Sequence, residues 1–151
     1  MRLVLYEPDI PQNAGALMRL AACLGLGLDV IEPCGFVLDD RRLRRAGMDY
    51  LDRLDWRRWP GWRSYLDSVQ QGRLVVLTTA GDAVLPETLF AADDRLLLGR
   101  ESAGVPDAVH AAADLRVRIP LSPGMRSLNV ATAAALALGK ALGDTGRWPG
   151  G

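Results

Sequence analysis

The segment from Ile119 to Asn129 holds the residue types best suited to chemistry, between a short apolar run and an alanine-rich run. Pro120 and Pro123 lack a backbone N–H and fix φ, whereas Gly124 can adopt a positive φ. The loop is therefore suited to one defined shape. A loop of this kind between a strand and a helix is a common place for a functional site.

Arg126, Ser127 and Asn129 present polar side chains at the end of this loop. Ser127 or Asn129 can cap the helix that follows, which leaves free N–H groups and the positive end of the helix dipole facing the loop. This arrangement favours a site for a polar ligand. The alternative interpretation is an ordinary connection from strand to helix with a good N-cap.

The size and composition of the chain indicate one compact domain. Its 151 residues, 49% of them hydrophobic, suffice for a core. No run approaches the roughly 20 apolar residues of a membrane span, and a proline stands where a signal peptide would still be hydrophobic. Cys23, Cys34 and the single His110 lack the spacing of a zinc site or a catalytic triad. We expect a cytoplasmic protein with no membrane partner, no metal and two reduced core thiols.

The basic residues are almost all arginines, although the formal net charge is zero. Eight arginines lie between Arg41 and Arg63, interleaved with tryptophans. Arginine suits phosphate and base edges better than lysine does, and genome bias is the alternative explanation of the composition. We expect one group of these arginines to contact RNA phosphates: Arg41, Arg42, Arg44 and Arg45. Trp56, Trp59 and Trp62 could stack on unpaired bases, but tryptophans more often belong to a core or an interface.

Five short apolar runs predict strands, at Arg2–Tyr6, Leu28–Ile31, Arg73–Thr78, Arg95–Leu98 and Leu115–Ile119. Because each run is continuous rather than alternating, we expect an α/β fold with a mainly parallel sheet and helices on both faces. A helix is predicted from near Asn13 to Gly25, and a short one from Asp39 or Asp40 to Gly47. Ligands bind beyond the carboxyl ends of such strands, so the loops after Tyr6, Leu77, Leu98 and Ile119 should converge.

Three motifs in order resemble those of the SPOUT class of S-adenosylmethionine-dependent RNA methyltransferases: NAGALMR (13–19), LLLGRESAGVP (96–106) and RIPLSPGMRSLNVATAAALAL (118–138). The segments YEPDIPQNAGALMRLAA and IEPCGFVLDDRRLRRAGMDY are similar to those of its small TrmL branch, tRNA wobble-nucleotide 2′-O-methyltransferases that consist of the catalytic domain alone. The resemblance covers nearly the whole chain up to Leu142. It implies a single SPOUT (alpha/beta knot) domain over residues 1–143, with a short flexible tail over residues 144–151.

The resemblance also implies a C-terminal trefoil knot, against the general rule that chains are unknotted. Members of the family are usually homodimers with active sites near the interface. The implied reaction is methyl transfer from S-adenosylmethionine, with S-adenosylhomocysteine as product, to the ribose 2′-hydroxyl of a wobble cytidine or modified uridine. A compact anticodon stem-loop of tRNA is the implied RNA partner. The alanines of the last helix would suit close packing in a dimer, or burial against the sheet.

Matching positions give the implied site residues. Those at the cofactor would be Leu77, Thr78, Gly99, Glu101, Gly104, Ile119, Leu121, Ser127 and Leu128. The catalytic group would be Asn13, Arg19, Glu101, Ser127 and Asn129, with Arg19 and Arg126 among the residues that contact RNA.

The chemistry of these residue types fits the implied roles. Two glycines permit close backbone approach to a nucleoside, and apolar side chains can enclose adenine. Arg19 is almost never neutral, so we expect it to hold a phosphate and stabilise developing alkoxide charge rather than act as base. Glu101 could take the proton, or it could hold Arg19 in place. Gly139 stands where close relatives often carry an aromatic residue implicated in tRNA contact, so this contact is either lost or supplied by Trp148 or by the tryptophan segment.

Other functions stay open at this level. The same reaction on ribosomal RNA or at another tRNA position is one alternative, and a non-catalytic RNA-binding protein of the same fold is another. A nicotinamide-dependent oxidoreductase is disfavoured because the glycines near Gly25 close a helix instead of opening one.

Overall fold

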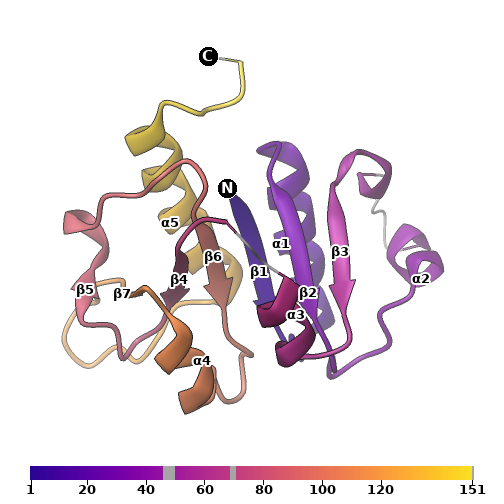
Figure 1. Ribbon diagram of the computed structural model, residues 1–151, viewed down its shortest axis with the longest axis horizontal. Helices are drawn as coiled ribbons and strands as arrows, with labels where there is room; N and C mark the ends of the chain where they lie inside the picture. The colour runs from indigo at the N-terminus through magenta and orange to yellow at the C-terminus, as the bar shows by residue number, and fades with distance from the viewer. Residues whose placement is uncertain (46–49, 69–70, 151) are drawn as a thin grey trace.

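Seven strands form one sheet in the computed structural model, which describes residues 1–45, 50–68 and 71–150 (Figure 1). Along the sheet they lie in the order β3-β2-β1-β6-β4-β7-β5. Their bounds are Arg2–Tyr6 (β1), Gly27–Ile31 (β2), Trp56–Trp59 (β3), Leu74–Leu77 (β4), Ala83–Val84 (β5), Arg95–Leu98 (β6) and Leu115–Arg118 (β7). All neighbouring pairs are parallel, which confirms the predicted sheet.

Helices cover both faces of this sheet. They are α1 (Pro11–Cys23), α2 (Asp40–Arg45), α3 (Trp62–Ser68), α4 (Asp107–Ala112) and α5 (Val130–Thr145), with short 3-10 turns at Leu51–Arg53 and Leu85–Glu87. Side chains of α1 and α5 belong to the larger hydrophobic cluster, and side chains of α3 and α4 belong to the smaller one. The parallel strands are thus joined through crossovers on either face, as the continuous apolar runs indicated. Among the described residues no helix is long and apolar enough to cross a membrane.

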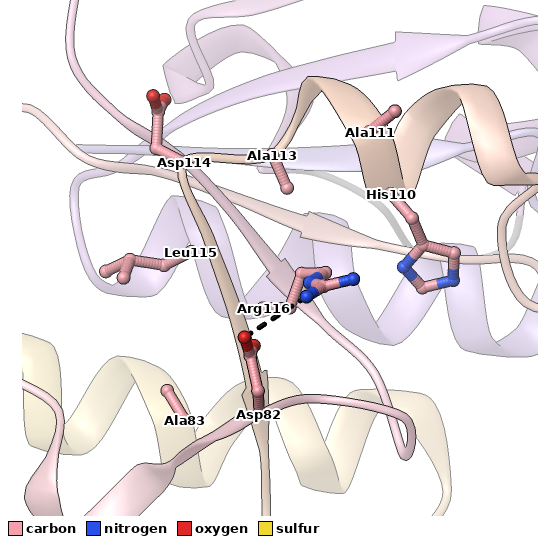
Figure 2. A pocket seen from close by; sticks show the side chains of 8 residues that line it. All are labelled: Asp82, Ala83, His110, Ala111, Ala113, Asp114, Leu115 and Arg116. Atoms are coloured by element: carbon pink, nitrogen blue, oxygen red, sulfur yellow. Dashed lines mark hydrogen bonds and ion pairs between the residues drawn. The ribbon is translucent and has the colours of Figure 1, made fainter.

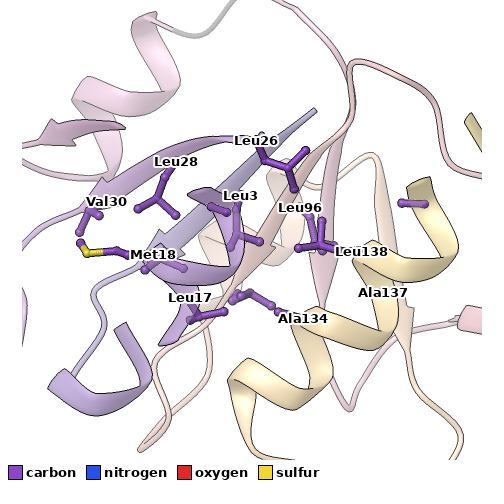
Figure 3. Close-up of a cluster of buried hydrophobic side chains, with 14 of the residues drawn as sticks. Leu3, Leu17, Met18, Leu26, Leu28, Val30, Leu96, Ala134, Ala137 and Leu138 are labelled. Atoms are coloured by element: carbon purple, nitrogen blue, oxygen red, sulfur yellow. The ribbon is translucent and has the colours of Figure 1, made fainter. Parts of the chain in front are cut away.

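Strand β1 shows why the runs are continuous. Leu3 and Leu5 face the larger cluster, with Leu17 of α1 and Leu138 of α5 around them (Figure 3). Val4 and Tyr6 face the smaller cluster on the other side. A strand alternates its side chains between two faces, so burial on both requires an apolar residue at every position.

Two strands were absent from the prediction. Strand β3 lies at the edge of the sheet, and its Arg57 and Arg58 are exposed. An edge strand that is half exposed lacks a continuous apolar run, so the segment WRRW (56–59) did not predict a strand. Strand β5 is at the other edge and spans only Ala83–Val84.

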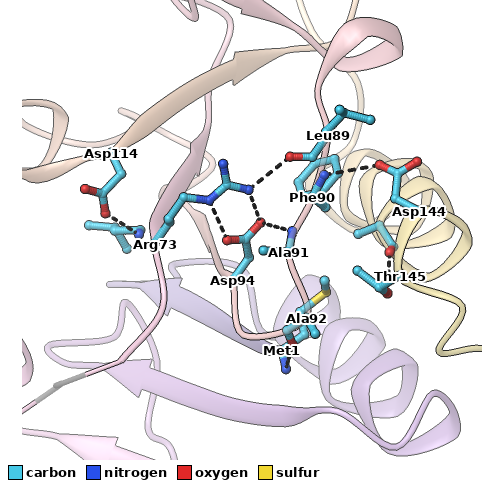
Figure 4. Close-up of polar contacts among 12 residues, drawn as sticks. Met1, Arg73, Leu89, Phe90, Ala91, Ala92, Asp94, Asp114, Asp144 and Thr145 are labelled. Carbon is cyan, nitrogen blue, oxygen red and sulfur yellow. Dashed lines mark hydrogen bonds and ion pairs between the residues drawn. The ribbon is translucent and has the colours of Figure 1, made fainter.

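A polar network holds the ends of the strands opposite the predicted ligand edge (Figure 4). Arg73 donates two hydrogen bonds, of 2.9 and 2.7 Å, to the fully buried carboxylate of Asp94. Asp114 accepts one of 2.7 Å from the N–H of Leu74, and the Met1 amino group donates one of 2.7 Å to the carbonyl of Ala92. The bonds from Arg73 satisfy the buried charge of Asp94, which would otherwise be costly to bury.

Several boundaries differ from those expected. Helix α1 begins at Pro11, so Asn13 lies in its first turn and Ile10 is the N-cap, without a side-chain bond. Proline is favoured at the first helical position because its missing N–H has no partner there anyway. The expected end of the second helix at Gly47 lies outside the described residues. Helix α5 continues to Thr145, two positions beyond the expected domain boundary, and the flexible tail stays a prediction.

The two cysteines are free, but they are not both core thiols. Cys23 is exposed at the end of α1, and Cys34 is half-buried. The expectation of two core thiols is therefore wrong for Cys23, whose position follows from helix rotation rather than from residue type. Burial, followed by the charge of Glu32, raises the pKa of the Cys34 thiol to about 11, so this side chain is a neutral packing residue at ordinary pH.

Candidate active site

A cavity of about 620 Å³ opens at the carboxyl ends of β4, β6 and β7. The loops after Leu77, Leu98 and Ile119 line it, together with Ile10 and Asn13 from the segment after β1. The predicted convergence of the four loops is confirmed. The volume lies within the usual range of sites for small molecules.

The cavity brings together nearly all the residues that the family resemblance implied. It is lined by Asn13, Leu77, Thr78, Gly99, Glu101, Gly104, Ile119, Leu121, Arg126, Ser127, Leu128 and Asn129. Arg19 is not among its lining residues. It is exposed on α1, where its Nη2 lies 3.4 Å from the hydroxyl of Tyr50 and its guanidinium lies 5.2 Å from the centroid of the Tyr50 ring.

The loop after β6 is a tight turn closed by two backbone hydrogen bonds between Arg100 and Gly104, of 3.1 and 2.8 Å. Gly104 has a φ of 65°, which glycine adopts without strain. A Cβ at Gly99 would lie 2.7 Å from the carbonyl carbon of Gly104. The close approach of these two backbones requires glycine at position 99, whereas the space around Gly104 is open.

Asn129 caps α5, as one of the two predicted candidates. Its side-chain oxygen accepts hydrogen bonds of 2.9 Å from Ala131 and 3.2 Å from Thr132. Its side-chain nitrogen donates a bond of 2.9 Å to the amide oxygen of Asn13. Asn13 and Asn129, which are 116 positions apart in sequence, are thus connected at the cavity wall by a hydrogen bond between their side-chain amides.

Glu101 is the carboxylate that lines the cavity, and its surroundings disfavour its charge. Burial, followed by the side chain of Asp9, raises its pKa above the usual range of glutamate. Its Oε2 accepts a hydrogen bond of 3.2 Å from the N–H of Asp9. Arg19 contacts Tyr50 instead, so the hypothesis that Glu101 holds Arg19 in place is wrong within one chain.

The tryptophans and arginines between positions 41 and 63 separate into two groups. Trp59 and Trp62 each lie 5.7 Å, centroid to centroid, from the ring of buried Tyr65, so they belong to the smaller core cluster. The alternative of base stacking is disfavoured for these two rings. By contrast, Arg41, Arg42 and Arg45 are exposed on α2, and Arg44 donates bonds of 2.6 and 3.1 Å to Asp52.

A second pocket, of about 520 Å³, lies between α4 and β7 (Figure 2). Arg116 donates a hydrogen bond of 3.1 Å to Asp82 in it, and His110 lies at its rim. None of the residues implied for the cofactor or for catalysis lines this pocket. The cavity at the strand ends is therefore the candidate active site.

Comparison with known proteins gives this cavity a context. The family model of the SpoU rRNA Methylase family matches residues 1–139 of the chain. The chain belongs to this family. The match includes every residue that lines the cavity.

Relatives of this SpoU family chain extend over nearly its whole length. It is 54% identical over 146 residues to the tRNA (cytidine(34)-2'-O)-methyltransferase of Beijerinckia indica, covering 95% of this chain and 91% of that one. A structure solved in work on the 2-OH methylation of C/U34 on tRNA superposes with a TM-score of 0.88 at 40% identity, covering 95% and 94% of the two chains. The SpoU methyltransferase AviRb of Streptomyces viridochromogenes, in complex with AdoMet, superposes with a TM-score of 0.82 at 29% identity, covering 94% of this chain and 56% of that one.

The structure adds site residues of this SpoU family chain that the sequence analysis did not select. Thr79, Arg100, Ser102 and Val105 line the cavity. Asp9 lies next to the cavity and contacts the loop after β6. In the sequence, only the positions of these residues indicated a role in the site, because all of them fall within or beside the loops that were predicted to converge.

Proposed function

We propose that this chain methylates the ribose 2′-hydroxyl of the wobble nucleotide, position 34, of a tRNA, with S-adenosylmethionine as the methyl donor and S-adenosylhomocysteine as the product. The observation that carries the proposal is the cavity itself, in which three separate motifs meet and Asn13 bonds to Asn129. The activity in the names of the full-length relatives supports the choice of reaction and nucleotide.

The residues present fit a nucleoside methyl donor. Leu77, Ile119 and Leu121 form a half-buried apolar wall that can enclose an adenine ring. Within the described part of the chain, the backbone N–H groups of Leu121 and Leu128 donate no hydrogen bond, so they are free to bind the polar edge of the adenine ring. The close turn at Gly99 lets a ligand approach the backbone. When bound, the donor supplies a methyl group that is already electrophilic because it is attached to a positively charged sulfur.

The residues of this chain have then to orient the ribose and accept its proton. Asn13 and Asn129 hold each other at the cavity wall and offer amide groups to a ribose hydroxyl. Glu101 is the carboxylate positioned to take the proton, and its raised pKa makes it a stronger base than an ordinary glutamate. Arg126 lines the same cavity and offers a positive charge to a neighbouring phosphate. The predicted trefoil knot remains part of this proposal.

The proposed assembly is a homodimer through the exposed face of α5. Leu136 is 49% exposed on this helix, and Leu128, which precedes the helix and lines the cavity, is 38% exposed. Thr132 and Ala135 are exposed next to them. An apolar face continuous with the rim of the cavity would place two active sites near the interface, as the family resemblance implied. The cytoplasmic location expected from the sequence fits a tRNA substrate and stays a prediction.

Leu136→Asp is expected to convert the dimer to a monomer, because a charge would be buried in an apolar interface. Size-exclusion chromatography with light scattering measures the change. Leu66→Asp is the matched control, since Leu66 is 39% exposed on α3, which covers the other face of the sheet. A dimeric Leu136→Asp protein would place the interface elsewhere.

The four arginines of α2 are proposed to contact tRNA phosphates, together with Arg126. Arg41→Ala combined with Arg45→Ala should weaken tRNA binding and reduce the slope of log K against log salt by roughly 0.7–0.9 for each phosphate that the protein no longer neutralises. Binding of S-adenosylmethionine should not change, because neither side chain lines the cavity. Filter binding over a salt series measures the slope. Arg116→Ala on β7 is the control, and an unchanged slope in the double variant would remove α2 from the RNA surface.

The test of the reaction uses tRNA purified from cells that lack their own wobble 2′-O-methylation. After incubation with protein and S-adenosylmethionine, mass spectrometry of nuclease fragments should show one added methyl group on the wobble ribose. The alternative substrates, ribosomal RNA or another tRNA position, would show the methyl group elsewhere. A protein that does not bind S-adenosylmethionine would favour the non-catalytic RNA-binding alternative, whereas binding without methyl transfer would mean that the substrate is a different RNA.

A further inference from the structure

The loop after β1 contacts the loop after β6 through reciprocal hydrogen bonds. Asp9 Oδ1 accepts a bond of 3.0 Å from the N–H of Glu101, and the N–H of Asp9 donates one of 3.2 Å to Glu101 Oε2. The second oxygen of Asp9 accepts a hydrogen bond from the hydroxyl of Ser102. The Asp9 side chain thus binds the backbone of Glu101 and the side chain of Ser102, and the Asp9 backbone N–H binds the carboxylate of Glu101.

Neighbouring contacts reinforce this connection. Glu7 forms an ion pair with Arg100, whose guanidinium lies 6.0 Å from the centroid of the Tyr6 ring. Glu7 has a φ of 43°, a conformation in the left-handed region that a glutamate adopts only when its surroundings enforce it. Both acidic residues of the first loop therefore bind the turn between Gly99 and Gly104.

A third loop, which contains Gly35, packs against Pro8 and Asp9. The N–H of Gly35 donates a hydrogen bond of 2.9 Å to the carbonyl of Pro8. A Cβ at Gly35 would lie 2.7 Å from Asp9 Cβ and 2.8 Å from Asp9 Cα. The backbone at position 35 therefore fixes how far Asp9 can withdraw from the cavity.

We propose that Asp9 is a positioning residue, which holds the turn from Gly99 to Gly104 in its binding shape and keeps the Glu101 carboxylate at the cavity wall. The proposal deepens the proposed function and rests on it for the meaning of Glu101. It assigns a task to a side chain outside the implied catalytic group.

The charges around Glu101 give Asp9 a second effect. The side-chain interaction with Glu101, followed by the hydroxyl of Ser102, lowers the pKa of Asp9, whereas burial and then Asp9 raise the pKa of Glu101. Asp9 therefore loses its proton at a lower pH than Glu101 does. The other polar groups at Glu101 or in the lining of the same cavity are Asn13 on α1, Arg126, and Arg100, which is paired with Glu7.

Asp9→Asn separates the charge of Asp9 from its hydrogen bonds. The amide keeps an oxygen that can accept from the N–H of Glu101, but the negative charge is gone. The pKa of Glu101 should therefore fall. Carbon NMR of the side-chain carboxyls measures the pKa of Glu101 directly. The chain has only four glutamates, and the Glu101→Gln variant identifies the resonance of Glu101 among them. Asp67→Asn, exposed on α3, is the matched control and should leave the titration midpoint unchanged.

Affinity for S-adenosylmethionine, measured by calorimetry without RNA, is the second readout. Asp9→Ala should weaken binding by about tenfold or more, and Ser102→Ala by roughly two- to tenfold, because each substitution removes hydrogen bonds to a charged group. Gly35→Ala should also weaken binding, although Gly35 is not among the residues that line the candidate active site, whereas Gly61→Ala, with open space around it, should not.

The two readouts decide the proposal. A Glu101 midpoint that does not move in Asp9→Asn would overturn it, because a merely structural Asp9 could lower affinity without changing that midpoint. Unchanged affinity in both Asp9→Ala and Gly35→Ala would overturn it as well. Neither readout needs RNA, so a failure of the wild-type protein to methylate tRNA would count against the proposed function and leave the role of Asp9 to these measurements.

Discussion

Gly99→Ala is expected to lower the affinity for S-adenosylmethionine by roughly 10- to 100-fold, the range of an overpacked site. The added Cβ would lie 2.7 Å from the carbonyl carbon and 2.9 Å from the Cα of Gly104. Both atoms belong to the backbone, so no side chain can rotate away. The turn would have to open, which would break the bonds between Arg100 and Gly104 and move Glu101.

Calorimetry gives the affinity, and thermal unfolding of the same samples separates loss of the site from loss of the fold. We expect Gly99→Ala to unfold cooperatively, because the turn contributes little to either hydrophobic cluster. Gly61→Ala is the control for adding a methyl group, since no atom lies within 4 Å of the added Cβ. Unaltered binding by Gly99→Ala would mean that the turn does not form the wall of the donor site.

The fold could be predicted as far as its strands are buried on both faces. Leu96, Leu97 and Leu98 of β6 alternate between the two clusters, so the sequence pattern and the structure have the same cause. Strand β3 was not predicted, because only one side of an edge strand has a neighbouring strand and its exposed arginines interrupt the apolar pattern. The order of the strands depends on long-range pairing, which a periodicity in one sequence does not contain.

The candidate site was predictable at the level of loops and motifs. The convergence of the segments after Leu77, Leu98 and Ile119 follows from the general rule for parallel sheets. Individual contacts were not predictable, because Asp9 and Glu101 are 92 positions apart and nothing local marks them as partners. Arg19 lies on the exposed side of α1 because tertiary packing buries the side of the helix that carries Leu17 and Ala21, and this packing is not contained in the local sequence.

Arg19→Ala should lower the rate of methyl transfer by about 100- to 1,000-fold while S-adenosylmethionine binds as before. Arg19 lies outside the cavity and holds the ring and hydroxyl of Tyr50, so the donor site does not depend on it within one chain. An exposed guanidinium is instead available to the phosphate and ribose of bound RNA. Single-turnover kinetics with excess enzyme separates the chemical step from tRNA binding.

Two further variants test whether the shape of the guanidinium matters in addition to its charge. Arg19→Lys keeps the charge but loses the planar fork, so it should recover only part of the rate. Arg63→Ala removes an exposed arginine from α3 and should leave the rate unchanged. Full activity in Arg19→Ala would exclude Arg19 from catalysis. Loss of S-adenosylmethionine binding in the same variant would contradict a role toward RNA, and it would indicate that Arg19 reaches a donor site only across the proposed dimer interface.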